Sequence, residues 1–192
     1  MRIGNKVATC GPPRTATKWL VSVINELEYT PMMVAGKGAH DPERFDDDLM
    51  PPVITTIRRP DAWIISMWYD HWSSGKWNPY PCTPEAEPLQ ADTLAEWCYN
   101  WIKSPCLVWE IWDKYLKDTS HVLAVSESKA TTERRAHSIL EPIYGECAIG
   151  LLHRKACYSG PTFPLDPMFR QRILDVNQYA VDFYLKHCKF GE

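Results

Sequence analysis

Short apolar runs alternate along this chain with longer segments in which apolar residues recur every three or four positions. The short runs have the length and β-branched content of buried strands, and they cover residues 6–10, 30–35, 53–57 and 121–125. The longer segments predict helices at residues 17–27, 60–72, 92 or 93 to 103, 105–117, 131–144 and 166–186. Strands that alternate with helices favour parallel pairing. We therefore expect an α/β fold of three layers, in which helices flank a mostly parallel β-sheet.

Three segments between these elements lack a periodic pattern. Residues 36–50 are polar and acidic, contain the run DPERFDDD, and are expected to form a loop or a short helix. Residues 73–90 contain one glycine and four prolines, which predicts a long surface loop. A loop of this length is often a lid or a binding segment. Residues 145–165 are irregular as well.

The composition narrows the class of protein. A chain of 192 residues fits a single domain, spanning residues 1–192. A net charge of −3 argues against a general nucleic-acid-binding protein, although it allows a local basic pocket. The seven cysteines are scattered without a CxxC pair, which favours reduced thiols over disulfides or a zinc site. With neither a signal peptide nor an apolar stretch of about 20 residues, we expect a soluble, cytoplasmic protein without a membrane partner. The oligomeric state is left open.

The stretch CGPPRTATKWL, residues 10–20, joins the first expected strand to the first expected helix. A helix N-terminus after such a loop binds anions, because its backbone N–H groups point outward and the helix dipole is positive there. Arg14 and Lys18 add full positive charges, and Thr15 and Thr17 add hydroxyl donors. The stretch therefore fits a site for a phosphate or a related oxyanion. It also fits a capped helix start with incidental charges.

The same stretch departs from the phosphate-binding loop of nucleotide hydrolases. That loop requires Gly, Lys and Ser or Thr at the positions where this chain has Ala16, Thr17 and Lys18. The hydroxyl that would hold magnesium is missing from its usual place, so we expect no metal. A second cation pair, Arg58-Arg59, follows the expected strand at residues 53–57. Because parallel strands end at one edge of a sheet, both groups of cations are expected at the same edge.

Two motifs resemble those of sulfotransferases. PRTATKWL, residues 13–20, is similar to the family's loop Pro-Lys/Arg-Ser-Gly-Thr-Thr-Trp-Leu. IRRPDAWIISMWYDHW, residues 57–72, resembles the family's Arg-Asn-Pro-x-Asp-x-x-x-Ser segment and keeps the eight-residue separation between Arg58 and Ser66. A weaker likeness joins VLAVSESK to the family's strand that ends in Tyr-Glu-Asp. The resemblance implies the P-loop-like fold of sulfotransferases.

Sulfotransferases move a sulfuryl group from 3′-phosphoadenosine 5′-phosphosulfate to a hydroxyl or amine, and 3′-phosphoadenosine 5′-phosphate is the product. The resemblance implies that the donor is bound by Pro13, Arg14, Thr15, Ala16, Thr17, Lys18, Trp19, Arg58, Ser66 and Arg154.

Individual roles follow from position within the two motifs. Arg14 matches the cation at the 5′ end, where it would stabilise charge on the bridging oxygen. Thr15 and Thr17 match hydroxyls that hold the 5′ phosphate, and Arg58 and Ser66 match groups that bind the 3′ phosphate.

Other positions in these motifs leave alternatives open. Trp19 matches a tryptophan that stacks on adenine, and a core tryptophan is the competing interpretation. Lys18, where a threonine is usual, adds charge near the sulfonate or points to solvent. Ala16 replaces a glycine, which puts the approach of the loop backbone to the ligand in doubt.

The acceptor must lose a proton as it attacks, so a general base is needed. The leading candidate is His40, because some relatives place a catalytic histidine between the two nucleotide motifs, and a loop histidine without a task is the alternative. Asp41 and Glu43 are the carboxylate candidates. Arg154, in His153-Arg154-Lys155, lies where many relatives close a basic loop over the 3′ phosphate, and a basic surface loop is its alternative.

The sequence thus predicts a metal-independent sulfotransferase. A kinase-like phosphotransferase on the same fold and a non-catalytic nucleotide-binding module are the alternatives. The acceptor is expected to be a small molecule or a carbohydrate. An aromatic wall that would suit such an acceptor is expected from Trp72, Trp77, Tyr80, Trp97 and Trp101.

Overall fold

The computed structural model describes residues 1–34, 50–73, 84–117, 119–146 and 165–188. The strands of this part of the chain are β1 (Arg2–Ile3), β2 (Ala8–Cys10), β3 (Met33–Val34), β4 (Val53–Arg58) and β5 (His121–Val125). Its α-helices are α1 (Thr17–Glu28), α2 (Pro60–Ser73), α3 (Leu94–Ile102), α4 (Leu107–Leu116), α5 (Lys129–Tyr144), α7 (Pro167–Val176) and α8 (Gln178–Cys188), and a 3₁₀ helix, η1, spans Pro84–Leu89.

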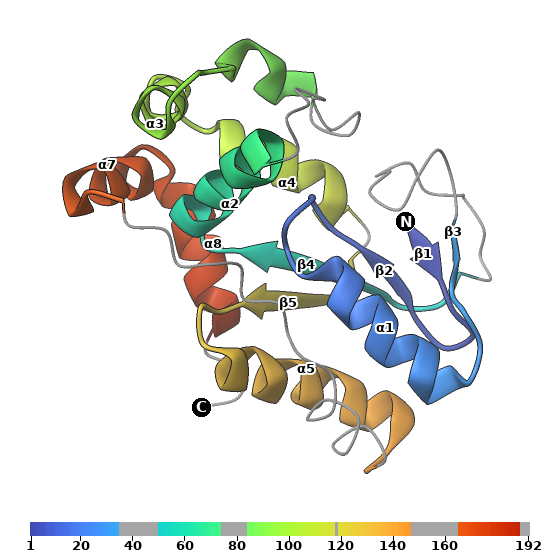
Figure 1. Ribbon diagram of the computed structural model, residues 1–192. Coiled ribbons are helices and arrows are strands. Elements are labelled where there is room, and N and C mark those ends of the chain that lie inside the picture. The colour runs from blue at the N-terminus through green and yellow to red at the C-terminus, as the bar shows by residue number, and fades with distance from the viewer. Residues whose placement is uncertain (35–49, 74–83, 118, 147–164, 189–192) are drawn as a thin grey trace.

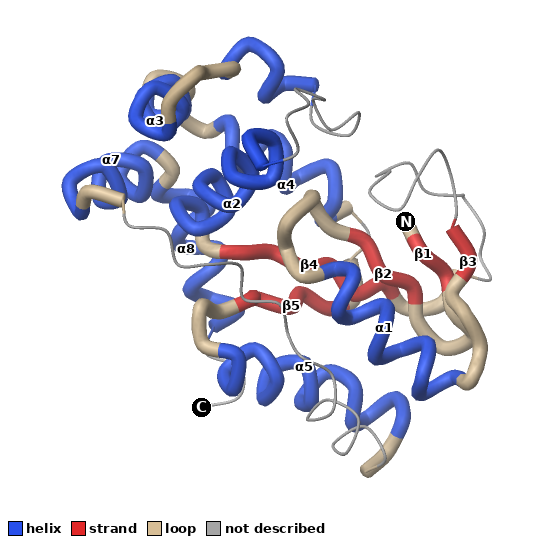
Figure 2. The backbone as a smooth tube through the Cα atoms, in the orientation of Figure 1, coloured by secondary structure: helices blue, strands red, loops and turns tan. Residues whose placement is uncertain are grey.

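The five strands form one open sheet in the order β3-β1-β2-β4-β5 (Figure 2). The central strand β4 pairs in parallel with β2 on one side and β5 on the other, with Thr55 opposite Cys10 and Val122. At the other edge, β1 runs antiparallel to both β2 and β3. The predicted α/β fold with a mostly parallel sheet is confirmed.

Helices cover both faces of this sheet, as Figure 1 shows. On one face, α1 and α5 pack their apolar side chains against Ile54, Leu123 and Val125. On the other face, α2, α4 and α8 pack against a larger core that includes Val53 and Ile57. Side chains of a strand alternate between faces, so β4 contributes to both cores.

Buried tryptophans dominate the larger core. Trp63, Trp97, Trp101 and Trp112 are each at most 1% exposed. Trp63 lies edge-on to Trp101 with ring centroids 5.7 Å apart, and Trp97 contacts Trp101 at the same distance. The expectation that Trp97 and Trp101 line an aromatic wall is therefore wrong, because both are needed to fill the core. The side chains of Trp72, Trp77 and Tyr80 lie outside the described residues.

Polar side chains set the start of three helices. The hydroxyl oxygens of Thr93 and Ser128 accept hydrogen bonds from backbone N–H groups three residues on, and so begin α3 and α5. The carboxylate of Asp166 caps α7, with Pro167 at its first position. In contrast, α1 begins after Ala16, which offers no capping side chain. Among the described residues, no side chain caps the N-terminus of α1.

The structure departs from the sequence prediction at both ends of the chain. Strand β1 was not predicted, because two residues are too few to form a periodic pattern. The single helix expected over residues 166–186 is two helices that meet at Asn177, whose side-chain amide donates to the carbonyl of Ile173 at 2.9 Å. That hydrogen bond satisfies a carbonyl at the end of α7 and allows the chain to turn into α8. In the described ranges, no helix is long and apolar enough to span a membrane.

Candidate functional site

The carboxyl ends of β2, β4 and β5 lie side by side because these three strands are parallel and adjacent. The loop of residues 11–16 follows β2 and leads into α1, and we call it the β2–α1 loop. Arg58 ends β4, and Ser126 and Glu127 follow β5. The prediction that cations from two strand ends meet at one edge of the sheet is confirmed for Arg14 and Arg58. Such edges are where ligands bind in open α/β sheets.

A chain of buried hydroxyls fastens the β2–α1 loop to the sheet. The Thr15 hydroxyl donates to the carbonyl of Pro12 at 2.6 Å and lies 2.8 Å from the hydroxyl of Thr56 on β4. The Thr17 hydroxyl also lies 2.8 Å from that of Thr56. Each hydroxyl has one proton. The Thr15 and Thr17 hydroxyl oxygens lie 3.3 Å apart. Since Thr15 gives its proton to Pro12, both 2.8 Å contacts are satisfied when Thr56 donates to Thr15 and Thr17 donates to Thr56.

These hydrogen bonds change the roles expected of the Thr15 and Thr17 side chains. The Thr15 and Thr17 hydroxyls were expected to donate to a phosphate. In the structure Thr15 is fully buried and Thr17 is 4% exposed, and their protons serve the hydroxyl chain. The geometry thus gives both side chains a role in fixing the shape of the loop.

Replacing Thr56 with valine should test that role. The change keeps the shape of the side chain and removes the middle hydroxyl, so we expect it to lower the free energy of unfolding by about 1–3 kcal/mol and to weaken anion binding. Thr55→Val is the matched control, because Thr55 points to the opposite face, where its hydroxyl contacts Tyr115 and Thr119 of another segment. Denaturant melts and anion titrations of both variants make the comparison. If Thr55→Val weakens anion binding equally, the hydroxyl chain has no special role.

The backbone of the β2–α1 loop is unusual. Arg14 and Ala16 have φ angles of 66° and 61°, a left-handed conformation that is uncommon for residues other than glycine. Alanine rarely adopts this conformation by itself, so the surrounding contacts must impose it at Ala16. Gly11 is needed for a different reason, because a Cβ there would lie 2.8 Å from the backbone oxygen of Thr56. Strained backbone of this kind often marks a functional loop.

One face of α2 holds the loop from the other side. The indole of Trp63 donates to the carbonyl of Pro13 at 2.8 Å, the guanidinium of Arg14 donates to Ser66 at 3.3 Å, and Asp70 pairs with Arg14 at 3.0 Å. Trp63, Ser66 and Asp70 are spaced three and four residues apart, so they form one stripe of the helix. The structure thereby brings together Arg14 and Ser66, which come from the two different motifs.

Arg58 is the cation whose environment most resembles that of a ligand-binding group. Its Nε is buried and makes no hydrogen bond to any residue that the structure describes. Burial lowers the pKa of Arg58 most, Glu127 opposes that effect, and the charge of Arg14 lowers the pKa further. Arg14 and Arg58 therefore lie close enough for their charges to repel. Negative charge bound beside them would offset both the cost of burial and the repulsion.

A network of charges surrounds Arg58. The carboxylate of Asp61 is fully buried, and Arg59 donates two hydrogen bonds to it, at 2.6 and 2.8 Å. Arg170 from α7 contacts the same carboxylate at 3.3 Å, and both arginines also lie 3.4 Å from Glu127. Both acids are bound by Arg59 and Arg170, whereas the Nε of Arg58 makes no hydrogen bond to a described residue. The hydrogen bonds that Arg59 donates to Asp61 raise the pKa of Arg59.

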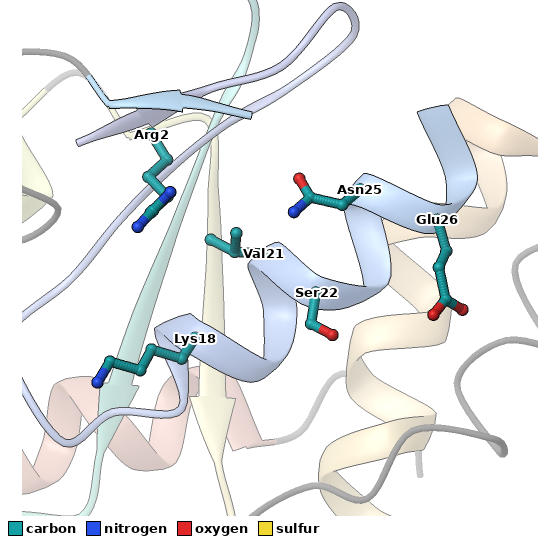
Figure 3. Close-up of a pocket in the computed structure, with 6 residues that line it drawn as sticks. All are labelled: Arg2, Lys18, Val21, Ser22, Asn25 and Glu26. Carbon is teal, nitrogen blue, oxygen red and sulfur yellow. The ribbon is translucent and has the colours of Figure 1, made fainter. Parts of the chain in front are cut away.

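Lys18 lies apart from these groups. It is exposed on the first turn of α1 and borders a hollow of about 390 Å³ between α1 and β1. Figure 3 shows the residues around this hollow, which are Arg2, Lys18, Val21, Ser22, Asn25 and Glu26. Of the two interpretations of Lys18, its exposure favours the one in which the side chain meets solvent.

Trp19 lies in the smaller core and is 6% exposed. This burial favours the core interpretation over stacking on a base, which needs one open face of the ring. His40, Asp41, Glu43 and Arg154 lie outside the described residues, so the expectations for them remain predictions.

Sequence reasoning did not identify Trp63, Asp70 and Thr56 as part of the site. A signal existed for the first two, because each lies on the same helical face as Ser66. For Thr56 the pattern gave no warning, since a threonine in a strand is ordinary. Comparisons of the chain with models of protein families, with curated proteins and with solved structures give no match.

Proposed function

We propose that this chain is a sulfotransferase with the P-loop-like fold of that family, and that its donor is 3′-phosphoadenosine 5′-phosphosulfate. The observation that carries the proposal is the buried, unpartnered Nε of Arg58 beside the charge of Arg14, among the described residues. A donor with a phosphate at each end of one nucleoside needs two cationic positions at the same edge of the sheet. The resemblance of both motifs supports this assignment and the geometry is compatible with it.

The residues at this edge of the sheet would bind different parts of the donor. Arg58 and Ser66 would bind the 3′ phosphate, because a guanidinium stays charged at every working pH and can donate two parallel hydrogen bonds. The backbone N–H groups at the start of α1, which has no side-chain cap, would hold the 5′ phosphate. The Thr15 and Thr17 hydroxyls would not donate to it, because their protons are used within the hydroxyl chain.

The transfer itself makes one bond and breaks one. The acceptor oxygen or nitrogen forms a bond to sulfur and gives up its proton to a general base. The bond between sulfur and the bridging oxygen breaks, and the electron pair stays on the 5′ phosphate. Arg14 would stabilise this new charge. His40, Asp41 and Glu43 remain the candidates for the base.

Calorimetry with the full chain tests the donor class. We expect 3′-phosphoadenosine 5′-phosphate to bind without added metal, and ATP and AMP to bind at least about a hundredfold more weakly, because each lacks the 3′ phosphate that Arg58 would hold. Equal binding of all three nucleotides, or binding of none, would overturn the proposal. Binding without turnover of any hydroxyl or amine acceptor would instead support a non-catalytic module.

Chelation distinguishes sulfuryl from phosphoryl transfer. A sulfuryl group carries less negative charge than a phosphoryl group, so side chains and backbone can stabilise it without a metal ion. We expect activity to persist in EDTA. Loss of activity in EDTA together with recovery in magnesium would favour the kinase-like alternative.

A further inference from the structure

The hollow between α1 and β1 is lined by two cations at the edge of the sheet where the β2–α1 loop begins. Because β1 runs antiparallel to β2, its first residue, Arg2, lies opposite Thr9, one residue before the end of β2. Lys18 lies in the first turn of α1, which starts at the same edge. Both cations border the hollow, whose volume is about 390 Å³. Sites for small molecules typically have volumes of about 300–1,000 Å³.

Three of the polar side chains around the hollow offer hydrogen-bond donors. In the described ranges, no acceptor or carboxylate pairs with the guanidinium of Arg2 or the ammonium of Lys18. Asn25 accepts a hydrogen bond from the backbone N–H of Met32 at 2.7 Å through its amide oxygen, so its amide nitrogen is the end that can donate. Figure 3 shows the Arg2 guanidinium and the Asn25 amide on the same side of α1, with Val21 between them.

A buried hydroxyl next to Arg2 is an independent sign of a ligand. Thr9 is fully buried, and its hydroxyl makes no hydrogen bond to any residue that the structure describes. Thr9 lies opposite both Arg2 and Ile54, and Ile54 packs against α1, so the Thr9 side chain is on the face that α1 covers. Buried polar atoms without a partner are rare. This one indicates that a water molecule or a ligand group completes the hydrogen bonds beside Arg2.

The acid among the lining residues, Glu26, lies toward the other end of the hollow. It follows Lys18 by eight residues, which corresponds to about 12 Å along a helix axis. Figure 3 shows its carboxylate directed away from Arg2. The end of the hollow that adjoins the start of α1 therefore presents cations, and cations with N–H donors bind negatively charged groups most strongly.

We propose that this hollow binds the acceptor, and that the acceptor is a small molecule with an anionic group, such as a carboxylate or a sulfate, held by Arg2 and Lys18. The inference rests on the proposed function, in which the backbone N–H groups at the start of α1 hold the 5′ phosphate. Lys18 directly follows Thr17, the first residue of α1. An acceptor anchored there by its anionic group would direct its hydroxyl or amine toward the sulfur.

Matched acceptors that differ in charge and keep their shape test the proposal. With the full chain saturated with 3′-phosphoadenosine 5′-phosphate, calorimetry compares 4-hydroxyphenylacetate with 4-hydroxyphenylacetamide, and 3-hydroxybutyrate with 3-hydroxybutyramide. We expect the carboxylate of at least one pair to bind about tenfold more tightly than its amide, because charge-assisted hydrogen bonds are the stronger ones. In Arg2→Gln and in Lys18→Gln this ratio should fall toward one. A ratio near one for both pairs in the wild type, or a preference that survives both substitutions, would overturn the inference.

Two variants and a control separate charge from structure. Lys18 is exposed, so Lys18→Gln provides a reading even if Arg2→Gln, at a partly buried position, fails to fold. Arg134→Gln removes a cation from an exposed position of α5, far along the chain from the hollow, and should leave the ratio unchanged. An equal loss of the preference in Arg134→Gln would mean that overall charge, and not the hollow, sets it.

The outcomes also distinguish this inference from the proposed function. If 3′-phosphoadenosine 5′-phosphate binds and neither carboxylate is preferred, the inference is wrong and the proposed function stands. If the nucleotide does not bind, the proposed function fails, and the acceptor role of the hollow fails with it.

Discussion

Replacing Arg58 with methionine is expected to weaken the binding of 3′-phosphoadenosine 5′-phosphate by about a hundredfold or more without destabilising the protein. The loss of affinity follows from two charge-assisted hydrogen bonds, each contributing about 1.5–3 kcal/mol. The expected effect on the free energy of unfolding has the opposite sign. Burial and the charge of Arg14 lower the pKa of Arg58, which means that the folded state disfavours its charged form.

The charge of Arg58 lowers the stability of the folded protein. A cation with a lowered pKa in the folded state costs stability at every pH below that pKa, and arginine stays protonated throughout the range in which proteins are studied. Removing the charge therefore removes a cost. In this variant Glu127 keeps its ion pairs with Arg59 and Arg170, so its carboxylate still has cationic partners. We expect the free energy of unfolding to stay the same or rise by about 1 kcal/mol.

Calorimetry and denaturant melts of the same preparations measure the two effects. Arg134→Met is the matched control, because Arg134 is exposed on α5 and contacts a threonine of its own helix. It should change neither quantity. The nucleotide affinity of Arg58→Lys should lie between those of the wild type and Arg58→Met, since lysine keeps the charge and loses the bidentate geometry. A variant Arg58→Met that unfolds readily and still binds the nucleotide would show that Arg58 is a structural residue.

Local sequence patterns predicted the elements whose bounds depend on residues close together in the chain. The bounds of β5 and the start of α1 at Thr17 follow from apolar runs, and both agree with the structure. The convergence of the β2–α1 loop and Arg58 followed as well, because parallel strands carry their carboxyl ends to one edge. The motif spacing indicated Arg58 and Ser66 as a pair, and the structure adds that Ser66 contacts Arg14.

What the sequence could not predict are contacts that form only after packing. The pairing of Arg14 with Asp70 depends on how the β2–α1 loop lies against α2, and that orientation is fixed by a buried tryptophan 50 residues away from the loop carbonyl. The hydroxyl chain through Thr56 likewise joins positions 41 residues apart. The left-handed backbone at Ala16 contradicts the preference of alanine, so tertiary contacts must impose it.

Replacing Trp63 with alanine should have the largest effect on stability of any change considered. Trp63 is fully buried between Trp101 and Trp112, with ring centroids 5.7 and 6.1 Å away. A cavity of this size costs about 3–5 kcal/mol, a large share of the 5–15 kcal/mol that stabilises a typical domain. The melting temperature should fall by about 6–20 °C, as measured by calorimetry or circular dichroism.

The milder change Trp63→Phe isolates the link between core and site. It retains an aromatic ring and removes the indole N–H that holds the Pro13 carbonyl, at a cost of about 1–3 kcal/mol. Trp97→Phe is a close match, because the Trp97 indole donates to the carbonyl of Ile64 at 2.9 Å within the same core. Both variants should lose similar stability. Only Trp63→Phe should weaken nucleotide binding, by about tenfold, since it alone frees the β2–α1 loop.

Equal nucleotide affinity in Trp63→Phe and Trp97→Phe would contradict this link. It would mean that the hydroxyl chain through Thr56 holds the loop without help from α2. A selective loss in Trp63→Phe would instead mean that the tryptophan core and the anion site share one hydrogen bond, at Pro13. The geometry favours the second result, because Pro13 directly precedes Arg14 and a shift of one moves the other. Core packing in this protein would then set the position of Arg14, the cation proposed for the 5′ end of the donor.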